Sequence, residues 1–107
     1  MANNILTPAS RKVMDALAEF PVSKGAYGRE LAGAAGLSPG SVYPILDKLE
    51  HAEMLLSEWE DIDVSEVGRP ARRYWRFTAR GAEVAREDLA ARMAKLAAAQ
   101  ANMGWAT

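Results

Sequence analysis

The first half of the chain has apolar side chains at helical spacing in two stretches, around residues 8–20 and 39–50. Each stretch begins with a hydroxyl residue followed by proline, Thr7-Pro8 and Ser38-Pro39. The hydroxyl caps free N–H groups of the first turn, and proline at the first helical position loses no hydrogen bond. The positions expected to face a core are Val13, Met14, Leu17 and Phe20 in the first helix, which Pro21 ends, and Val42, Ile45, Leu46 and Leu49 in the later helix.

A shorter helix is predicted between these two, starting near Tyr27 and closed by Gly36, after a loop over residues 22–26. A tight, glycine-containing turn separates it from the helix that Ser38 caps. Two helices joined in this way are typical of a helix-turn-helix, whose second helix enters the major groove of DNA.

In the second half of the chain, the spacing of apolar residues changes from helical to strand-like. Residues 54–61 lack helical periodicity and predict a strand, residues 62–71 a loop, and residues 72–78 an alternating strand. We expect Trp59 and Trp75 to pack this sheet against the helices. A long helix should follow the N-cap Thr78 and extend to about Asn102. The order predicts a mainly α (α+β) winged helix-turn-helix over residues 1–78, with a C-terminal helix over 79–107.

Charge is segregated along the chain, although the net charge is only −1. The stretch from Glu50 to Glu66 is acidic and has no Lys or Arg. Its part from Glu58 to Glu66 could bind a cation, but we expect it to form a solvated flank that repels phosphate. The stretch between Val67 and Ala82 has five arginines and no acid. A charge run alone often marks only a solvated face. On the loop and returning strand of a wing, however, it favours contact with DNA.

Several of these segments resemble the PadR family of transcription regulators. The matching motifs are Tyr27-Gly28-x-Glu30-Leu31, the segment Leu37-Ser38-Pro39-Gly40-Ser41-Val42-Tyr43-Pro44-Ile45-Leu46-x-x-Leu49-Glu50, then Ser57-Glu58-Trp59, and Gly68-Arg69-Pro70-x-Arg72-Arg73-Tyr74-Trp75-Arg76-Phe77-Thr78-x-x-Gly81. The resemblance implies a winged helix that dimerises through its C-terminal helix and usually represses transcription. Some members release DNA when a phenolic or drug-like molecule binds. The chain departs from the family at Glu53, where a glycine is usual, so either the turn differs there or the fold tolerates the strain of a side chain.

We expect Ser41 and Tyr43 to contact the DNA groove, because both lie in the first turns of the recognition helix. Tyr43 could instead pack on the core, Pro44 could be only a local kink, and Lys48 could face solvent. The first turns have no Arg, Asn or Gln, so we expect hydroxyl and methyl contacts in the major groove and shape readout by Arg69 in an A·T-rich minor groove. With the residues that the resemblance adds, the predicted DNA-binding set is Tyr27, Ser38, Ser41, Tyr43, Pro44, Lys48, Arg69, Arg72 and Arg73.

The last helix is rich in alanine and longer than so small a core can cover, which favours a dimer seam over packing on its own domain. Arg92 interrupts the seam. The expected dimerisation residues are Ala82, Ala85, Leu89, Leu96, Ala99 and Met103. A planar apolar ligand could bind at the dimer centre among Met14, Met93, Met103 and Trp105, although Trp105 could simply pack on the partner subunit.

The sequence favours no enzyme. It has no cysteine, one histidine, no glycine-rich phosphate loop and no nucleophile paired with a base, so we expect no catalytic site, metal or cofactor. The lack of cysteine suits a reducing cytoplasm. The expected partners are an operator in double-stranded DNA and a second copy of the chain. Two alternatives remain: a ligand sensor that releases DNA, and a winged helix used only for protein contacts.

Overall fold

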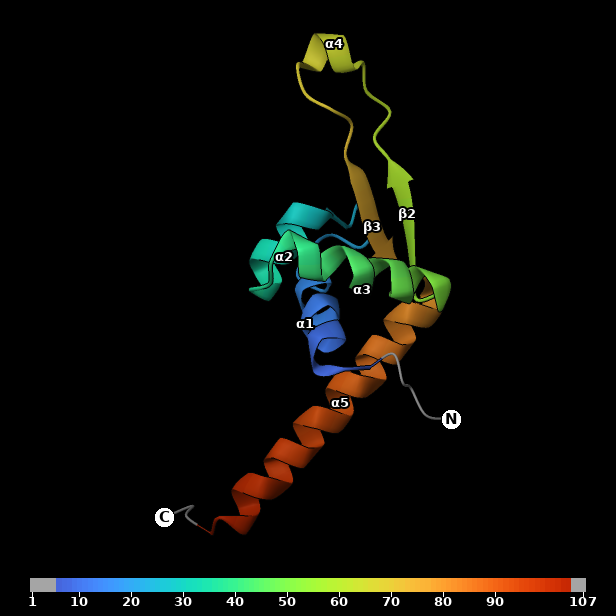
Figure 1. Cartoon of the computed structure of the whole chain (residues 1–107). Helices are drawn as coiled ribbons and strands as arrows, with labels where there is room; N and C mark the ends of the chain where they lie inside the picture. Colours follow the sequence, from blue (N-terminus) through green and yellow to red (C-terminus); the bar gives the residue numbers. More distant parts are fainter. Residues whose placement is uncertain (1–5, 105–107) are drawn as a thin grey trace.

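The computed structural model describes residues 6–104, so Trp105 lies outside the described residues. Helices and a small antiparallel sheet follow one another as in a winged helix (Figure 1). The sheet has the strand order β1-β3-β2. The elements are α1 (Pro8–Leu17), β1 (Ala26–Tyr27), α2 (Gly28–Ala35), α3 (Pro39–His51), β2 (Leu55–Trp59), α4 (Val64–Val67), β3 (Arg73–Phe77) and α5 (Ala79–Asn102).

The predicted helix starts are confirmed. The side chains of Thr7, Ser38 and Thr78 accept hydrogen bonds from the backbone N–H groups three residues later, at the starts of α1, α3 and α5. The prediction that Pro21 ends the first helix was wrong by a few residues. Its last helical residue is Leu17, after which the backbone tightens into a turn in which Glu19 N donates to Ala16 O.

Two elements were missed. The predicted loop before α2 contains β1, which has only two residues and pairs with Trp75 and Tyr74 of β3. The predicted loop over residues 62–71 contains α4, a single helical turn that Asp63 caps by accepting from the N–H groups of Ser65 and Glu66. Neither element is long enough to show a period in sequence.

The core lies where the three N-terminal helices meet the sheet. Val42, Leu46 and Leu49 of α3 are buried as predicted, and Ile45 is partly buried. Phe20 is also only partly buried. Trp75 is fully buried at the centre of the sheet. Trp59 contradicts the prediction, because it lies at the far end of β2 and is 66% exposed.

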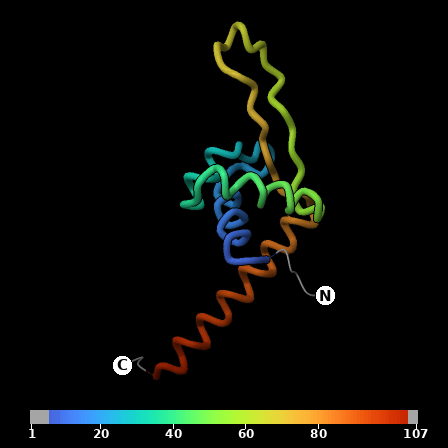
Figure 2. The backbone as a smooth tube through the Cα atoms, viewed as in Figure 1, coloured from blue at the N-terminus to red at the C-terminus, as the bar shows by residue number. Residues whose placement is uncertain are grey.

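The molecule is elongated, with principal extents of 62 × 32 × 25 Å. The wing, defined as residues 55–77, extends from one end of the helical body, and α5 extends from the other (Figure 2). None of the described helices combines the length and apolar character that crossing a membrane would require.

Glu53 adopts the left-handed conformation that the family usually gives to glycine, with φ of 61°. It follows the C-cap Ala52 of α3. Met54 N donates to Leu49 O at 2.9 Å and Glu53 N donates to Glu50 O at 2.9 Å, the two hydrogen bonds of a Schellman motif. Thr78 Oγ1 also donates to Glu53 O at 2.7 Å. The turn is therefore of the usual form, and the fold tolerates the strain of a side chain there.

Glu53→Gly is expected to raise the free energy of unfolding by about 1 kcal/mol, because glycine adopts positive φ without a Cβ clash. Chemical denaturation of the two proteins measures this difference. Glu53→Ala, which keeps the Cβ and removes only the carboxylate, should leave stability near that of the wild type. A loss of stability in Glu53→Gly would contradict this reading of the turn.

Candidate nucleic-acid interface

The outer face of α3 is exposed over its first two turns. Burial of Val42, Leu46 and Leu49 fixes the rotation of the helix, so Ser41, Tyr43 and Pro44 face outward. The Ser38 hydroxyl donates to Ser41 Oγ at 3.1 Å, which holds both hydroxyls at the helix start. Pro44 has no N–H, so the helical hydrogen bond to the carbonyl of residue 40 is absent. Lys48 is exposed further along the helix.

Tyr43 is held in place by the glycine beneath it. Its side chain is 43% exposed, and the ring lies so close to Gly28 that a Cβ there would be 2.5 Å from Tyr43 Cζ. Gly28 is the first residue of α2 and is itself buried. The close approach of the two helices therefore presents the tyrosine ring at the surface in a fixed orientation. The ring is therefore not enclosed in the core, and its contact with a binding partner stays a prediction.

An aromatic pair lies against Arg72 of the wing. The rings of Tyr27 and Tyr74 meet edge to face with centroids 5.5 Å apart. The Arg72 guanidinium lies 4.3 Å from the centroid of the Tyr27 ring. Among the residues that the structure describes, no carboxylate lies within ion-pair distance of Arg72. Its positive charge is therefore available to a phosphate.

Arg69 is instead paired within the wing. Its Nη1 donates to Glu60 Oε1 at 2.6 Å and its Nη2 donates to Glu60 Oε2 at 3.1 Å. Glu60 Oε1 also accepts from Arg72 N at 2.9 Å. The expectation of a solvated acidic flank is wrong at Glu60, whose side chain is 17% exposed and neutralised by arginine. A DNA phosphate at Arg69 must therefore compete with this carboxylate.

The hydrogen bond from Arg69 lowers the pKa of Glu60 from 4.5 to about 2, with further help from the N–H of Arg72. The pair raises the pKa of Arg69 in turn. Because folding lowers the pKa of Glu60, its ionised carboxylate stabilises the fold at pH values above the unfolded-state pKa. This contribution disappears as the pH falls from about 4.5 toward about 2.

Removal of the guanidinium in Arg69→Gln is expected to raise the pKa of Glu60 toward its usual range, since the largest cause of the shift is gone. Carboxyl ¹³C chemical shifts recorded through an acid titration report this pKa directly. Arg76→Gln, which breaks a more exposed pair with Glu58, serves as the control and should leave the Glu60 titration unchanged. A Glu60 midpoint that stays near 2 in Arg69→Gln would contradict the assignment.

Arg73 links the wing to α3. Its Nη2 donates to Glu50 Oε1 at 3.0 Å, its Nε donates to Ser57 Oγ at 2.9 Å, and Ser57 Oγ donates to Glu50 Oε2 at 2.8 Å. The guanidinium also lies 4.3 Å from the centroid of the Trp75 ring. Arg73 therefore connects β3 to β2 and α3 through side-chain hydrogen bonds, which its place in the arginine run did not reveal.

The tip of the wing is acidic rather than basic. It holds Asp61, Asp63 and Glu66, with Val64 and Val67 exposed between them. The arginines lie nearer the helical body. Only this proximal part of the wing has the charge that a DNA backbone requires.

A groove of about 580 Å³ lies between the start of α3 and the proximal wing. We call it the α3–wing groove. It brings together five of the predicted DNA-binding residues, whereas Ser38, Ser41, Pro44 and Lys48 lie outside its lining. It also contains Arg29 and Trp59, which sequence reasoning did not assign to DNA. Its lining is Tyr27, Gly28, Arg29, Tyr43, Trp59, Arg69, Pro70, Ala71, Arg72 and Arg73, with no acidic residue.

The opposite end of the molecule carries the predicted dimer seam. Arg92 ties α5 to α1, with Nη2 2.8 Å from Asp15 Oδ1 and Nε 2.9 Å from Asp88 Oδ2, and these pairs raise its pKa. Ala85 packs against the core of its own domain. Beyond this anchor α5 extends away from the body (Figure 1). The apolar side chains exposed along it are Leu89, Met93, Leu96 and Met103.

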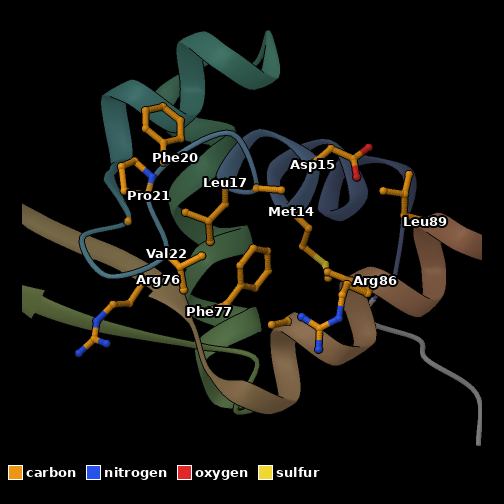
Figure 3. A pocket seen from close by; sticks show the side chains of 14 residues that line it. Met14, Asp15, Leu17, Phe20, Pro21, Val22, Arg76, Phe77, Arg86 and Leu89 are labelled. Carbon is orange, nitrogen blue, oxygen red and sulfur yellow. The ribbon is translucent and has the colours of Figure 1, made fainter.

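A second, apolar pocket of about 180 Å³ lies between the end of α1, β3 and the start of α5 (Figure 3). Met14, Leu17, Phe20, Phe77 and Leu89 line it, with Ala82, Ala85 and Arg86 from α5. Met14 thus faces a pocket, but neither Met93 nor Met103 lines it. Within one chain, these three predicted ligand-binding methionines are not brought together. The described residues contain no cluster of side chains suited to a metal ion.

Three antiparallel strands on a helix-turn-helix, with β2, β3 and their long connection as a wing, define a winged helix-turn-helix protein. Residues 27–87, more than half of the chain, match the transcriptional regulator PadR-like family, and the chain belongs to that family. The family consists of transcription regulators and is not an enzyme family. No curated protein sequence matches the chain.

Solved structures of regulators share the fold. A PadR family transcriptional regulator from Eggerthella lenta is 26% identical with a TM-score of 0.62, covering 89% of this chain and 82% of its own. The PcaV regulator from Streptomyces coelicolor, solved with its natural ligand, is 21% identical with a TM-score of 0.73, covering 99% and 68%. Lactococcus lactis ZitR is 22% identical with a TM-score of 0.69, covering 94% and 62%. The chain thus spans less than two thirds of the length of ZitR.

Proposed function

We propose that the protein is a DNA-binding transcription regulator, a homodimer that represses by occupying a near-palindromic operator. The observation that supports this most strongly is the α3–wing groove. It places an exposed recognition helix beside arginines, with no acidic side chain in the lining. This juxtaposition suits a duplex whose major groove takes α3 while its adjacent backbone meets the wing.

Base readout from α3 is limited in this proposal. Ser41 offers a hydroxyl, Tyr43 a hydroxyl and a ring edge, and Pro44 an apolar surface for a thymine methyl. Arg72 and Lys48 supply contacts to phosphate, which give affinity without sequence preference. Arg69 contributes shape readout only after it exchanges Glu60 for the DNA.

The dimer rests on the outer part of α5. Exposed apolar side chains continue beyond Arg92 on a helix that its own domain does not cover there. A second copy of the same helix would bury them. The resulting two-fold axis would present two α3 helices to successive turns of one face of a duplex.

Selection of bound duplexes from a random pool tests the proposed function. We expect a two-fold symmetric site with A·T-rich positions beside each half-site. Affinity for the selected duplex should fall steeply with salt, and the mass of the complex should correspond to two chains per duplex. No enrichment from the pool, with a salt-independent residual affinity, would favour the protein-interaction alternative.

A small effector is the second candidate, because the pocket in Figure 3 is apolar and opens between α1 and α5. Its volume of about 180 Å³ suits a planar aromatic compound, and Arg86 at its edge suits an acidic group on that compound. Because residues of α1 and α5 both line the pocket, a bound compound would change the angle between α5 and the DNA-binding body. Release of the selected duplex on titration with simple aromatic acids would support this role.

A further inference from the structure

We propose that Trp59 is a DNA-contacting residue whose indole packs against the sugars and base edges of the minor groove beside the site of α3. This inference rests on the proposed function and names a contact that neither the charge pattern nor helical position assigns.

The register of the sheet sets the direction in which Trp59 faces. Alternate residues of a strand share a face, so Leu55, Ser57 and Trp59 lie on one side of β2. Their antiparallel partners on β3 are Phe77, Trp75 and Arg73. This is the side that faces α3, because Ser57 and Arg73 both bond to Glu50 of that helix.

Burial changes along this face with distance from the helical body. Leu55 of β2 is buried, and so is Trp75, the β3 partner of Ser57. Ser57 itself bonds to Glu50 of α3 at the edge of the body. Trp59, the next residue of β2 on this face, lies opposite Arg73 at the end of the strand and is 66% exposed. The face that forms the core near the body thus becomes an open apolar surface in the proximal wing.

The residues around Trp59 indicate which kind of partner would cover its indole. It shares the α3–wing groove with Tyr43 of the recognition helix and with Arg69 and Arg72, and no acidic residue lines that groove. A second apolar protein surface would leave Arg72 without an anionic partner, whereas Arg69 already has Glu60. A nucleic acid backbone supplies both phosphates for the arginines and flat apolar sugar faces for the indole. Apolar side chains inserted beside basic ones are a common feature of minor-groove binding.

The acidic wing tip restricts the contact to this part of the wing. Asp61 and Asp63 follow Trp59 within four residues and would repel phosphates from any deeper insertion. The proposed contact on this strand therefore ends at Trp59, the last residue of β2.

Two variants of Trp59 test the contact with the selected duplex and with a random-sequence duplex of equal length as probes. Trp59→Ala is expected to weaken binding to the selected duplex by about tenfold or more, and Trp59→Phe by much less. Because an indole neutralises no phosphate, the slope of log affinity against log salt should stay at the wild-type value in both. Arg72→Ala should reduce that slope by about one phosphate contact. Val67→Ala at the exposed wing tip is the matched control and should bind as the wild type does.

The outcomes separate this inference from the proposed function. If the wild type binds neither duplex, the proposed function fails. If the wild type binds and Trp59→Ala binds equally well, the proposed function stands and the Trp59 contact is overturned. Weaker binding by Trp59→Ala with a reduced salt slope would also overturn it, because the indole would then act through the arginines rather than on the DNA.

Discussion

Gly81→Ala is expected to lower the free energy of unfolding by about 3 kcal/mol, near the upper end of what overpacking costs. Gly81 is the third residue of α5, and a Cβ there would overlap the carbonyl oxygen of Met54 and lie 2.7 Å from its carbonyl carbon. That carbonyl also accepts from Thr78 N at 3.0 Å, so it cannot move away without loss of a bond. The start of α5 must shift off the α3–β2 corner. This contact explains why position 81 of this chain requires glycine.

Thermal and chemical denaturation measure this effect, and Gly33→Ala provides the matched control. Gly33 lies in α2, is exposed, and has no atom within 4 Å of where a Cβ would be. Its replacement should raise stability by about 1 kcal/mol through helix propensity alone. If Gly81→Ala were as stable as the wild type, the packing of α5 on the corner of α3 and β2 would be wrong.

Tyr43→Ala is expected to weaken binding to the selected duplex by roughly tenfold to a hundredfold while leaving affinity for random duplex almost unchanged. The ring is exposed and is held against Gly28, so its loss removes a contact to bases without removing a phosphate contact. Stability should change little, because the residues that anchor α3 are Val42, Leu46 and Leu49. Fluorescence anisotropy with the two duplexes measures both affinities.

Tyr43→Phe separates the contribution of the aromatic ring from that of the hydroxyl group. Retention of most specific affinity would assign the contact to the ring, and a loss as large as in Tyr43→Ala would assign it to the hydroxyl. Equal losses for selected and random duplexes in Tyr43→Ala would contradict a role in sequence recognition.

Much of the fold was predictable because its signals are local. Thr7, Ser38 and Thr78 cap their helices through hydrogen bonds within one turn, and the apolar spacing of α3 fixes which face is buried. The position of Glu53 was also visible in sequence, since a turn that usually needs glycine forms there with a side chain. Elements of two and four residues, β1 and α4, have no period and so could not be predicted.

The sequence predicted several residues of the candidate site but not which partners their side chains have. Arg69, Arg72 and Arg73 form one run in sequence, yet one is paired with Glu60, one lies on Tyr27 and one links the wing to Glu50. These differences arise from residues far away along the chain. Trp59 was expected to pack the sheet against the helices, and only the structure shows that it lies at the exposed end of β2.

The most direct test of the account is a map of amide and indole NMR shifts in the protein when the selected duplex is added. We expect the largest changes at the start of α3, at residues 69–73 and at the Trp59 indole, with small changes at the acidic turn α4. Changes confined to α5 or to the wing tip, with the α3–wing groove unaffected, would contradict it.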